Sequence, residues 1–372
     1  MASMKVGRKA RWIGPGRVNL IGEHTDYNAG LALPFAIEQG CVAEVSIRSA
    51  DFAAVSAQFG EVVVSFEEAE RLPSYAGPTW VRYALGPVWA LRQAGIDIPP
   101  LQVRTDSGVP IGAGLSSSAA VICAVTTAIV DLVDAAVDND ALLAVTRAVE
   151  NEVVGAPTGG LDQWASLRCR PGAALLCDFS DGSSRQVRFD PVAAGLAVLV
   201  VDTKAPHRHA DGEYAQRRAG CERAAVQLGI PSLREVRDLD SALEALGDAE
   251  LRRYVRHVVT ENARVERVVD LLEDGRVGDI GPLLSASHAS LRDEYRVTVP
   301  QLDMAVAVLE ETGALGARMT GGGFGGCVIA LVPASDVDHA VEAVMRVFAR
   351  EGFTAPGTFV VQPSAGARRL LD

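Results

Sequence analysis

The stretch from Gly321 to Gly326, with the sequence Gly-Gly-Gly-Phe-Gly-Gly, is the feature that most limits how this chain can fold. Five of its six residues are glycines, and glycine weakens the interior of a helix or strand because its backbone loses the most freedom on ordering. We therefore expect a tight turn between two strands, close to another segment or to a bound phosphate. A plain hairpin turn is the alternative, although such turns rarely need five glycines.

A second glycine-rich stretch, Val109-Pro-Ile-Gly-Ala-Gly-Leu-Ser-Ser-Ser-Ala-Ala120, runs directly into an apolar segment that we expect to be helical from Ser116 to Leu132. Glycines let a backbone approach a polyphosphate closely, and the first amides of a helix, together with its dipole, attract an anion. The hydroxyls of Ser116, Ser117 and Ser118 add donors and a candidate magnesium ligand. The alternative is that these serines only cap the helix.

Residues 16 to 28, Gly-Arg-Val-Asn-Leu-Ile-Gly-Glu-His-Thr-Asp-Tyr-Asn, place polar side chains between short apolar steps. Donors and acceptors of differing reach are what a site needs to hold a small molecule covered with hydroxyl groups. A polar edge strand followed by a turn is the alternative. The six polar side chains are Arg17, Asn19, Glu23, His24, Asp26 and Asn28.

Two carboxylates, Glu150 and Asp162, flank a loop containing glycine and proline in the segment ENEVVGAPTGGLDQW. We expect Glu150 near the end of one helix and Asp162 at, or just before, the start of the next. Brought together, they would offer a ligand for a magnesium ion that bridges phosphates and an acceptor for a hydroxyl that attacks phosphorus. The alternative is that both face solvent, as acidic residues beside loops usually do.

The composition excludes several classes of protein. A formal net charge of −12 argues against a duplex nucleic-acid partner, because such proteins normally carry a basic face. Only three of the 35 basic residues are lysines and none follows a glycine-rich turn, which excludes a Walker-type phosphate loop. Six dispersed cysteines without a CxxC pair read as reduced thiols, and no signal peptide or bilayer-long apolar run is apparent. We therefore expect a cytoplasmic protein without a membrane partner.

The order of the expected elements favours an α+β fold over a parallel doubly wound sheet, because strands and helices follow one another without a regular repeat. We expect two domains, residues 1–192 and 193–372, divided just after Asp190-Pro191. Strands are expected at 31–35, 41–47, 61–66, 101–105, 173–178, 186–189, 196–201, 315–320, 327–332 and 358–362, and helices at 79–94, 116–132, 136–154, 213–228, 235–246, 254–274, 300–312 and 335–350.

In this order and spacing, the four segments resemble the galactokinases of the GHMP small-molecule kinase superfamily. GRVNLIGEHTDYN is similar to the family's sugar-site signature, PIGAGLSSSA to its phosphate loop and GARMTGGGFGGC to its third motif. The segments His209–Arg218 and Ser287–Tyr295 also resemble galactokinase sequences, so the resemblance spans residues 16 to about 330. The glycine motifs indicate only the superfamily, whereas GEHTDYN points to the sugar kinases within it.

The resemblance implies a two-domain GHMP kinase fold, with an N-terminal domain like domain 2 of ribosomal protein S5, a ferredoxin-like C-terminal domain and an active site in the cleft between them. It implies transfer of the γ-phosphoryl group of ATP to the anomeric hydroxyl of α-D-galactose, giving galactose 1-phosphate and ADP. Mg²⁺ is the implied cofactor, and galactose and ATP are the implied partners. The sequence does not distinguish a monomer from a homodimer.

The resemblance also implies roles for individual residues. Asp162 is the implied catalytic aspartate with Arg17 beside it, and Trp80 falls at the adenine pocket. The implied sugar contacts are Glu23, His24, Asp26, Gly159 and Tyr214; the implied ATP loop is Gly112, Ala113, Gly114, Leu115, Ser116, Ser117 and Ser118; and the implied metal ligands are Ser117, Ser118 and Glu150.

The positive charge of Arg17 favours an ionised Asp162, and a carboxylate stabilised in this way is a weak base. We therefore expect Asp162 to orient the sugar hydroxyl and to accept its proton late, while Arg17 also stabilises charge on the transferring group. For His24, a sugar contact competes with a satisfied core histidine. His207 and His209 are expected to form no more than a solvated turn.

Three other functions remain open from the sequence: a kinase for N-acetylgalactosamine or arabinose, a non-catalytic sugar and nucleotide sensor, and a Rossmann oxidoreductase. The last lacks the expected βαβ unit with its acidic residue. Two departures from the family pattern are visible. Ala29 stands where glycine is commoner, and Gly-Leu-Asp-Gln-Trp164 replaces Ile-Met-Asp-Gln-Phe, which is expected to bear on the pocket wall around the sugar.

Overall fold

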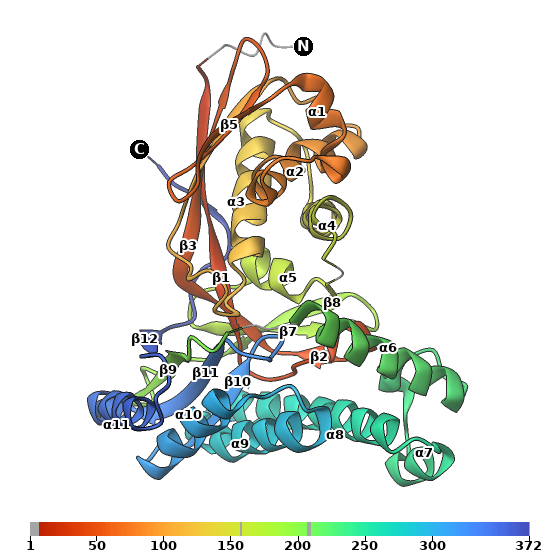
Figure 1. Cartoon of the computed structure of the whole chain (residues 1–372), viewed down its shortest axis with the longest axis vertical. Coiled ribbons are helices and arrows are strands. Elements are labelled where there is room, and N and C mark those ends of the chain that lie inside the picture. The colour runs from red at the N-terminus through yellow and green to blue at the C-terminus, as the bar shows by residue number, and fades with distance from the viewer. Residues whose placement is uncertain (1–6, 157, 207–209, 372) are drawn as a thin grey trace.

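The computed structural model describes residues 7–156, 158–206 and 210–371 and has an upper and a lower part stacked along its long axis (Figure 1). A tall sheet covered by helices forms the upper part, and a smaller sheet over a layer of helices forms the lower part. Among the described strand pairs only β4–β6 is parallel. The expected α+β class is therefore confirmed, and a doubly wound parallel sheet is not seen in these residues.

The upper sheet has six strands, and α3 packs along two of them, β1 and β3. Its backbone lies so close to β1 that a Cβ added at Gly14 would be 2.4 Å from the carbonyl oxygen of Ala120. In sheet order the strands are β13 (Arg368–Arg369), β1 (Lys9–Asn19), β3 (Pro34–Ile47), β6 (Leu101–Ser107), β4 (Phe52–Ser56) and β5 (Gly60–Val64), and the helices are α1 (Phe66–Glu70), α2 (Thr79–Gln93), α3 (Ser117–Leu132), α4 (Asn139–Ala148) and α5 (Leu161–Arg168).

The lower sheet is antiparallel, and its strands β9, β10 and β11 are buried on both faces. Leu196, Val198 and Val200 of β9 join the core of the upper part, whereas the alternate residues of the strand face the lower helices. This two-sided burial explains why β9 reads as a continuous apolar run. The strands in order are β10 (Gly316–Thr320), β11 (Cys327–Pro333), β9 (Leu196–Asp202) and β12 (Gly357–Val361), and the helices are α6 (Ala210–Leu228), α7 (Leu239–Ala245), α8 (Ala249–Glu273), α9 (Gly281–Ser290), α10 (Pro300–Glu311) and α11 (Val337–Arg350).

A third, three-stranded sheet, β2 (Leu31–Ala32), β7 (Ala173–Asp178) and β8 (Ser183–Arg188), lies between the two parts (Figure 1). The chain returns to the upper sheet near its end, where β13 pairs with β1. The expected division at 192/193 stays a prediction, and residues 368–369 lie in the upper sheet rather than with the lower part. No helix in the described ranges is long and apolar enough to cross a membrane.

Several expected elements differ from those observed. The helix expected over 136–154 is α4 followed by a π-helical turn, Val149–Val154, and α9 was not expected at all. Strand β1 begins at Lys9, well before the polar stretch at residues 16–28, and no strand was expected there. The short helix α9 has no consistent apolar face, so its sequence does not predict a helix. Tertiary contacts with β10 and α8 hold it in place instead.

Candidate active site

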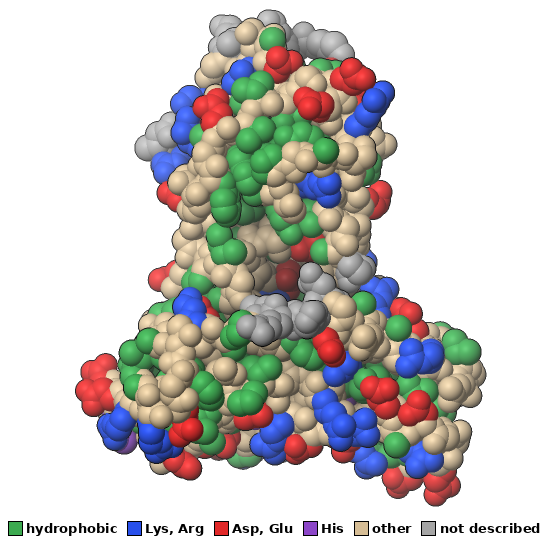
Figure 2. All heavy atoms as spheres, in the orientation of Figure 1, with side chains coloured by type: hydrophobic (Ala, Val, Ile, Leu, Met, Phe, Trp, Pro, Cys, Tyr) green, Lys and Arg blue, Asp and Glu red, His purple; other side chains and the backbone are tan. Residues whose placement is uncertain are grey.

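The four chemistry-bearing segments meet at one cavity of about 310 Å³ between the upper and lower parts. The molecular surface is hollowed at this junction, with acidic atoms deep inside (Figure 2). Both halves of the chain contribute to its walls, as a cleft between domains requires. The lining residues are Arg17, Glu23, His24, Asp26, Gly112, Gly114, Leu115, Ser116, Ser117, Ser118, Thr158, Gly160, Leu161, Asp162, Tyr214, Gly321 and Gly322.

Arg17, at the end of β1, joins the carboxylate of Asp162 to the glycine-rich loop. Its Nη2 lies 2.6 Å from Asp162 Oδ1, and its Nη1 donates to the carbonyl oxygen of Gly114 at 2.6 Å. The Arg17 side chain is 8% exposed and that of Asp162 is 21% exposed, and both line the cavity. Asp162 lies in the first turn of α5, as the sequence predicted.

The loop before α3 has the geometry of an anion site. Gly112 and Gly114 both have φ of +75°, and Ser116, the residue immediately before α3, has φ of +59°. The Ser116 side chain does not cap the helix, and its Oγ is buried with no hydrogen-bond partner. The helix end therefore faces the cavity without the usual side-chain acceptor, which leaves its dipole and first amides for an external anion.

The glycine turn between β10 and β11 closes the cavity opposite this loop. A Cβ at Gly321 would lie 3.1 Å from the carbonyl oxygen of Gly114, and one at Gly323 would lie 2.4 Å from that of Val297. Both glycines have positive φ. The turn is a hairpin, as the plain alternative required, and it also lies against the phosphate-loop backbone, which explains its glycine density.

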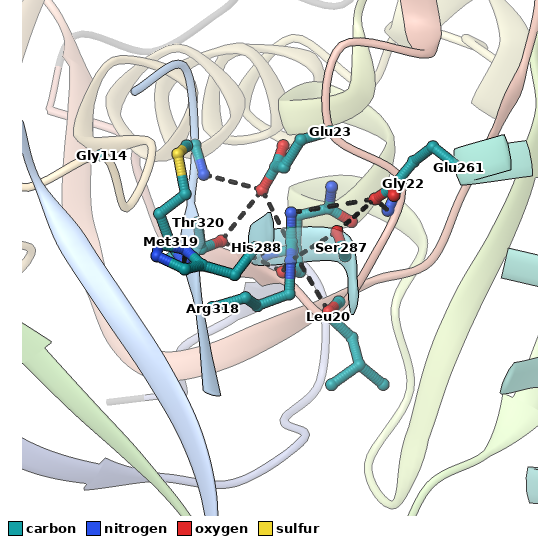
Figure 3. A network of polar contacts seen from close by, with 12 residues as sticks. Leu20, Gly22, Glu23, Gly114, Glu261, Ser287, His288, Arg318, Met319 and Thr320 are labelled. Carbon is teal, nitrogen blue, oxygen red and sulfur yellow. Dashed lines mark hydrogen bonds and ion pairs between the residues drawn. The ribbon is translucent and has the colours of Figure 1, made fainter. Parts of the chain in front are cut away.

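Glu23 is held by this turn rather than left to solvent. Its Oε1 accepts hydrogen bonds from the amide of Gly321 at 2.7 Å and from Oγ1 of Thr320 at 3.2 Å, and lies 3.5 Å from Nη1 of Arg318 (Figure 3). One carboxylate oxygen is thereby fixed by the protein, and the side chain still lines the cavity. A sugar contact through the second oxygen fits this arrangement.

Arg318 on β10 is completely buried and connects three elements beneath Glu23. Its Nη1 donates to the carbonyl oxygens of Asn19 and Leu20, and its Nε donates to Oγ of Ser287 (Figure 3). The buried Glu261 on α8 accepts from the amide of Gly22 at 3.0 Å and from Ser287. This network ties the polar stretch at 16–28 to the third motif.

His24 lies at the cavity wall with φ of +62°. Its Nδ1 is 2.8 Å from the hydroxyl of Tyr27, whereas Nε2 is buried and has no partner in hydrogen-bond geometry, although the backbone of Gly322 lies near it. Burial lowers the pKa of His24 to about 3, so the ring is neutral. The two readings of His24 are thus compatible: one ring nitrogen is satisfied in the core and the other faces the site.

Asp26 lies directly against Gly159. A Cβ at Gly159 would be 2.2 Å from Oδ2 of Asp26, so any larger residue there would displace the carboxylate. Burial raises the pKa of Asp26 to about 6, and the negative charges of Asp162 and Glu23 add to the rise. The site therefore concentrates three carboxylates in a small space, which suits a polyhydroxyl ligand that donates hydrogen bonds.

Glu150 lies behind the serines, at the π-helical turn that follows α4. Its Oε1 accepts from Oγ of Ser118 at 2.9 Å, and its Oε2 accepts from Thr158 at 3.0 Å and from Gln163. Burial, followed by the charge of Asp162, raises the pKa of Glu150. No cluster of three or more His, Cys, Asp or Glu that would hold a metal is found among the described residues.

Trp80 lies outside the main cavity, in a neighbouring apolar one of about 230 Å³ that shares Ser117 and Ser118 with it. The Trp80 ring stacks on Phe59 at 6.0 Å between centroids, and Ile111 lines the same space. Apolar side chains gather on the upper part of the molecule above the hollow (Figure 2). A flat ligand such as a nucleotide base fits in this cavity against these rings, with its phosphates toward the serines.

The structure separates the other candidates. Tyr214 lines the cavity, whereas Ala113 is buried within the loop and Asn28 instead donates to the carbonyl oxygen of His24. Asn19 is fully buried outside the lining. Trp164 packs on Phe179, away from the cavity, whereas Gly160 and Leu161 of the same departure from the family pattern line the cavity, as expected. His207 and His209 lie outside the described residues.

Sequence reasoning missed several residues of the site. Thr158, Arg318 and Tyr295 lie within the segments quoted above but had no expected role, and Phe59 and Glu261 lie outside those segments. A buried arginine in a strand and a glutamate on the apolar face of a helix are weak signals, and only the fold shows that they meet. The glycines Gly321 and Gly322 were indicated by their density alone.

Comparisons with known proteins agree with this geometry. Residues 82–170 match the family model of the GHMP kinases N terminal domain, residues 268–350 that of GHMP kinases C terminal, and residues 5–47 the galactokinase galactose-binding signature. The chain is 50% identical over 364 residues to the galactokinase of Streptomyces coelicolor, covering 97% of this chain and 94% of that protein. The chain belongs to the galactokinase family of GHMP kinases.

Other galactokinases extend the likeness. That of Mycobacterium tuberculosis is 43% identical, covering 95% of this chain and 97% of its own length. The crystal structure of Lactococcus lactis galactokinase complexed with galactose superposes with a TM-score of 0.91 at 30% identity, covering 97% of this chain and 95% of that one. A mevalonate kinase structure matches with a TM-score of 0.69 at 17% identity, which shows the shared GHMP fold.

Proposed function

We propose that this chain transfers the γ-phosphoryl group of ATP to the anomeric hydroxyl of α-D-galactose, giving galactose 1-phosphate and ADP. The observation that carries the proposal is the contact of Arg17 with both Asp162 and Gly114. That contact joins the carboxylate proposed to face the sugar to a glycine loop that suits phosphates, which supports the proposal. The galactokinase relatives named above make galactose the substrate and do not favour N-acetylgalactosamine or arabinose.

Galactose binds among Glu23, His24, Asp26 and Tyr214 in this proposal, with Gly159 leaving room for Asp26. The carboxylates accept from sugar hydroxyls, and Tyr214, whose pKa is raised well above its usual value by burial, stays a neutral phenol beside them. The sugar is thereby held with one hydroxyl toward Asp162.

ATP binds with its base in the apolar cavity lined by Trp80 and Phe59 and its phosphates on the loop from Gly112 to Ser118. The unpartnered Oγ of Ser116 and the uncapped end of α3 support this orientation. The two cavities share Ser117 and Ser118, so the terminal phosphate faces the sugar site.

Asp162 orients the anomeric hydroxyl and accepts its proton late in the transfer. Its contact with Arg17 holds the carboxylate in one position, from which it can orient that hydroxyl. Arg17 also lies where charge builds on the transferring phosphoryl group, and phosphoryl transfer depends mainly on such positioning and charge stabilisation.

Mg²⁺ fits the residues at Ser118 and Glu150. A hydroxyl and a carboxylate oxygen in contact are ligands that Mg²⁺ prefers, and a cation there would offset the burial and the nearby charge of Asp162 that raise the pKa of Glu150. Bound there, Mg²⁺ would neutralise phosphate charge. Replacing Glu150 by Gln should therefore weaken the Mg²⁺-dependent part of ATP binding, measured calorimetrically without sugar.

A non-catalytic sensor is disfavoured because the residues needed for transfer are assembled in contact. We also propose a cytoplasmic location, which suits six cysteines that are all unpaired and buried.

The test of the proposed function is ADP release from MgATP with galactose, N-acetylgalactosamine, glucose or arabinose, with the product identified by phosphorus NMR. Galactose should give the highest kcat/KM and a single phosphate ester at the anomeric carbon. Sugar binding without ADP release for any of the four would support a sensor instead.

A further inference from the structure

Four polar side chains, of which only Tyr27 is partly rather than fully buried, run in a line from the sugar wall into the lower core. His24 Nδ1 lies 2.8 Å from the hydroxyl of Tyr27, which lies 2.8 Å from the hydroxyl of Tyr295, which in turn lies 3.1 Å from Sγ of Cys221. Tyr27 belongs to the polar stretch, Tyr295 follows α9, and Cys221 lies on α6. Three separate segments thus converge behind one ring of the sugar site.

All four groups are neutral. Burial lowers the pKa of His24 to about 3 and raises that of Cys221 to about 11. Burial also raises the pKa values of Tyr27 and Tyr295 well above their usual value. Each phenol and the thiol therefore carries one proton, and the neutral imidazole carries one on a single ring nitrogen.

Only two orientations of these protons fill all three contacts and leave neither phenol proton without an acceptor. In one, Cys221 donates to Tyr295, Tyr295 to Tyr27, and Tyr27 to Nδ1 of His24. In the other, every bond is reversed and Sγ is the final acceptor. An imidazole nitrogen accepts well and a thiol sulfur only weakly, so the first orientation places the best acceptor at the end of the line. In that orientation the His24 proton is on Nε2.

We propose that Tyr27 and Tyr295 act as positioning residues that hold His24 in the Nε2–H tautomer, so that His24 donates a hydrogen bond to a hydroxyl oxygen of the sugar. The unpartnered Nε2 at the cavity wall is the atom that makes this donation. Glu23 and Asp26 only accept when ionised, so His24 supplies a donor that these two carboxylates lack.

The inference rests on the proposed galactose site and defines how one part of it selects its ligand. Ring contacts support it: Tyr295 lies 4.8 Å from His24 and 4.4 Å from His257 between centroids, which limits rotation of the His24 ring. His257 itself is bonded elsewhere, to Ser290 and to the carbonyl oxygen of Glu23, and so does not compete for Tyr27.

The test is long-range ¹H–¹⁵N NMR of the full chain labelled with ¹⁵N-histidine, with the His24 signals assigned by their loss in His24→Gln. The wild type at pH 7 should show a neutral His24 with its proton on Nε2. Tyr27→Phe should produce a mixture of tautomers. A proton on Nδ1 in the wild type, or an unchanged tautomer in Tyr27→Phe, would overturn the proposal.

Kinetics give a second readout with a matched control. In a mixture of tautomers only part of the population can donate to the sugar, so the galactose KM should rise about two- to tenfold in Tyr27→Phe and less in Tyr295→Phe, with the ATP KM unchanged. Tyr254 packs on Tyr295 at 5.1 Å but bonds to Glu250 outside the line, so Tyr254→Phe should change neither KM nor tautomer.

The outcomes separate the two proposals. An inactive wild type with the Nε2–H tautomer would overturn the proposed reaction but not the positioning of His24 by Tyr27 and Tyr295. An active wild type with the Nδ1–H tautomer would overturn only that positioning. Equal effects of Tyr254→Phe and Tyr27→Phe on the galactose KM would show a general loosening of the aromatic cluster. That result would also overturn the proposed positioning of His24.

Discussion

Arg17 Nη2 lies 2.6 Å from Asp162 Oδ1, although the two residues belong to β1 and α5 and are far apart in sequence. The same guanidinium reaches the phosphate loop through the carbonyl oxygen of Gly114. Movement of either partner therefore displaces the other, so the sugar-facing carboxylate and the phosphate site keep a fixed separation.

Replacing Arg17 by lysine should lower kcat about 100-fold, with less than a threefold change in the galactose KM. A single ammonium cannot hold both Asp162 and Gly114 in the geometry of a guanidinium fork. Steady-state kinetics measure this, and Arg8→Lys, at an exposed pair with Asp134, is the matched control. A kcat in Arg17→Lys close to that of the control would argue against a role in transfer.

Replacing Gly159 by alanine should raise the galactose KM at least tenfold, because the new Cβ would meet Oδ2 of Asp26 at 2.2 Å and push the carboxylate from its place. The ATP KM should stay within about twofold, since Gly159 does not lie against the phosphate loop. Gly247→Ala, with open space around the added Cβ, is the control. Equal galactose KM values in both variants would contradict the assignment.

Galactose affinity should fall as the pH drops through about 6. The pKa of Asp26 is raised to about 6 by burial and by the charges of Asp162 and Glu23, so below this pH Asp26 is protonated and no longer accepts freely from the sugar. From pH 7 to pH 5, calorimetric affinity should fall about tenfold in the wild type and little in Asp26→Asn. The sign for stability is opposite: a raised carboxyl pKa stabilises the fold at low pH, and this contribution is lost as pH rises through about 6.

Glu261 should make the fold acid-sensitive in a lower range. Burial raises the pKa of Glu261, but the charges of Arg264, His257 and Arg318 lower it more, to about 2. A lowered carboxyl pKa stabilises the protein above the ordinary value of 4.5, and the contribution is lost as pH falls through about 2.

The predicted loss for the buried Glu261 is roughly 3 kcal/mol in the free energy of unfolding over that range. Urea unfolding of the wild type and Glu261→Gln at pH 5 and pH 3 measures the difference. Glu266→Gln, an exposed position on the same helix, should behave as the wild type does. Parallel pH slopes in the wild type and Glu261→Gln would contradict the role of the network in Figure 3.

The sequence contains the site residues because their chemistry is local. A glycine-rich turn followed by an apolar helix predicts an anion site wherever it folds, and α3 and its loop agree with that expectation. Glu150 and Asp162 likewise lie near the helix ends that the loop of glycine and proline between them predicts. Site residues that lie within one contiguous motif can therefore be predicted without knowing the fold.

The residues behind the site could not be read in this way. Arg318 contacts Leu20 and Glu23 across nearly the whole chain, and Tyr295 meets Tyr27 across a comparable separation. Such pairs depend on the register of β10 and on the docking of α9, which are fixed by tertiary packing rather than by local pattern. Ala29, with φ of +53°, likewise has a conformation that its residue type does not suggest.

The most direct measurement compares Asp162→Asn with the wild type, using galactose binding by calorimetry and ADP release with MgATP in the same preparation. The account predicts binding within about threefold of the wild type and turnover reduced at least 1,000-fold, because the amide can still touch the sugar but cannot accept its proton. Near-normal turnover with intact galactose binding would contradict the role of Asp162 in transfer.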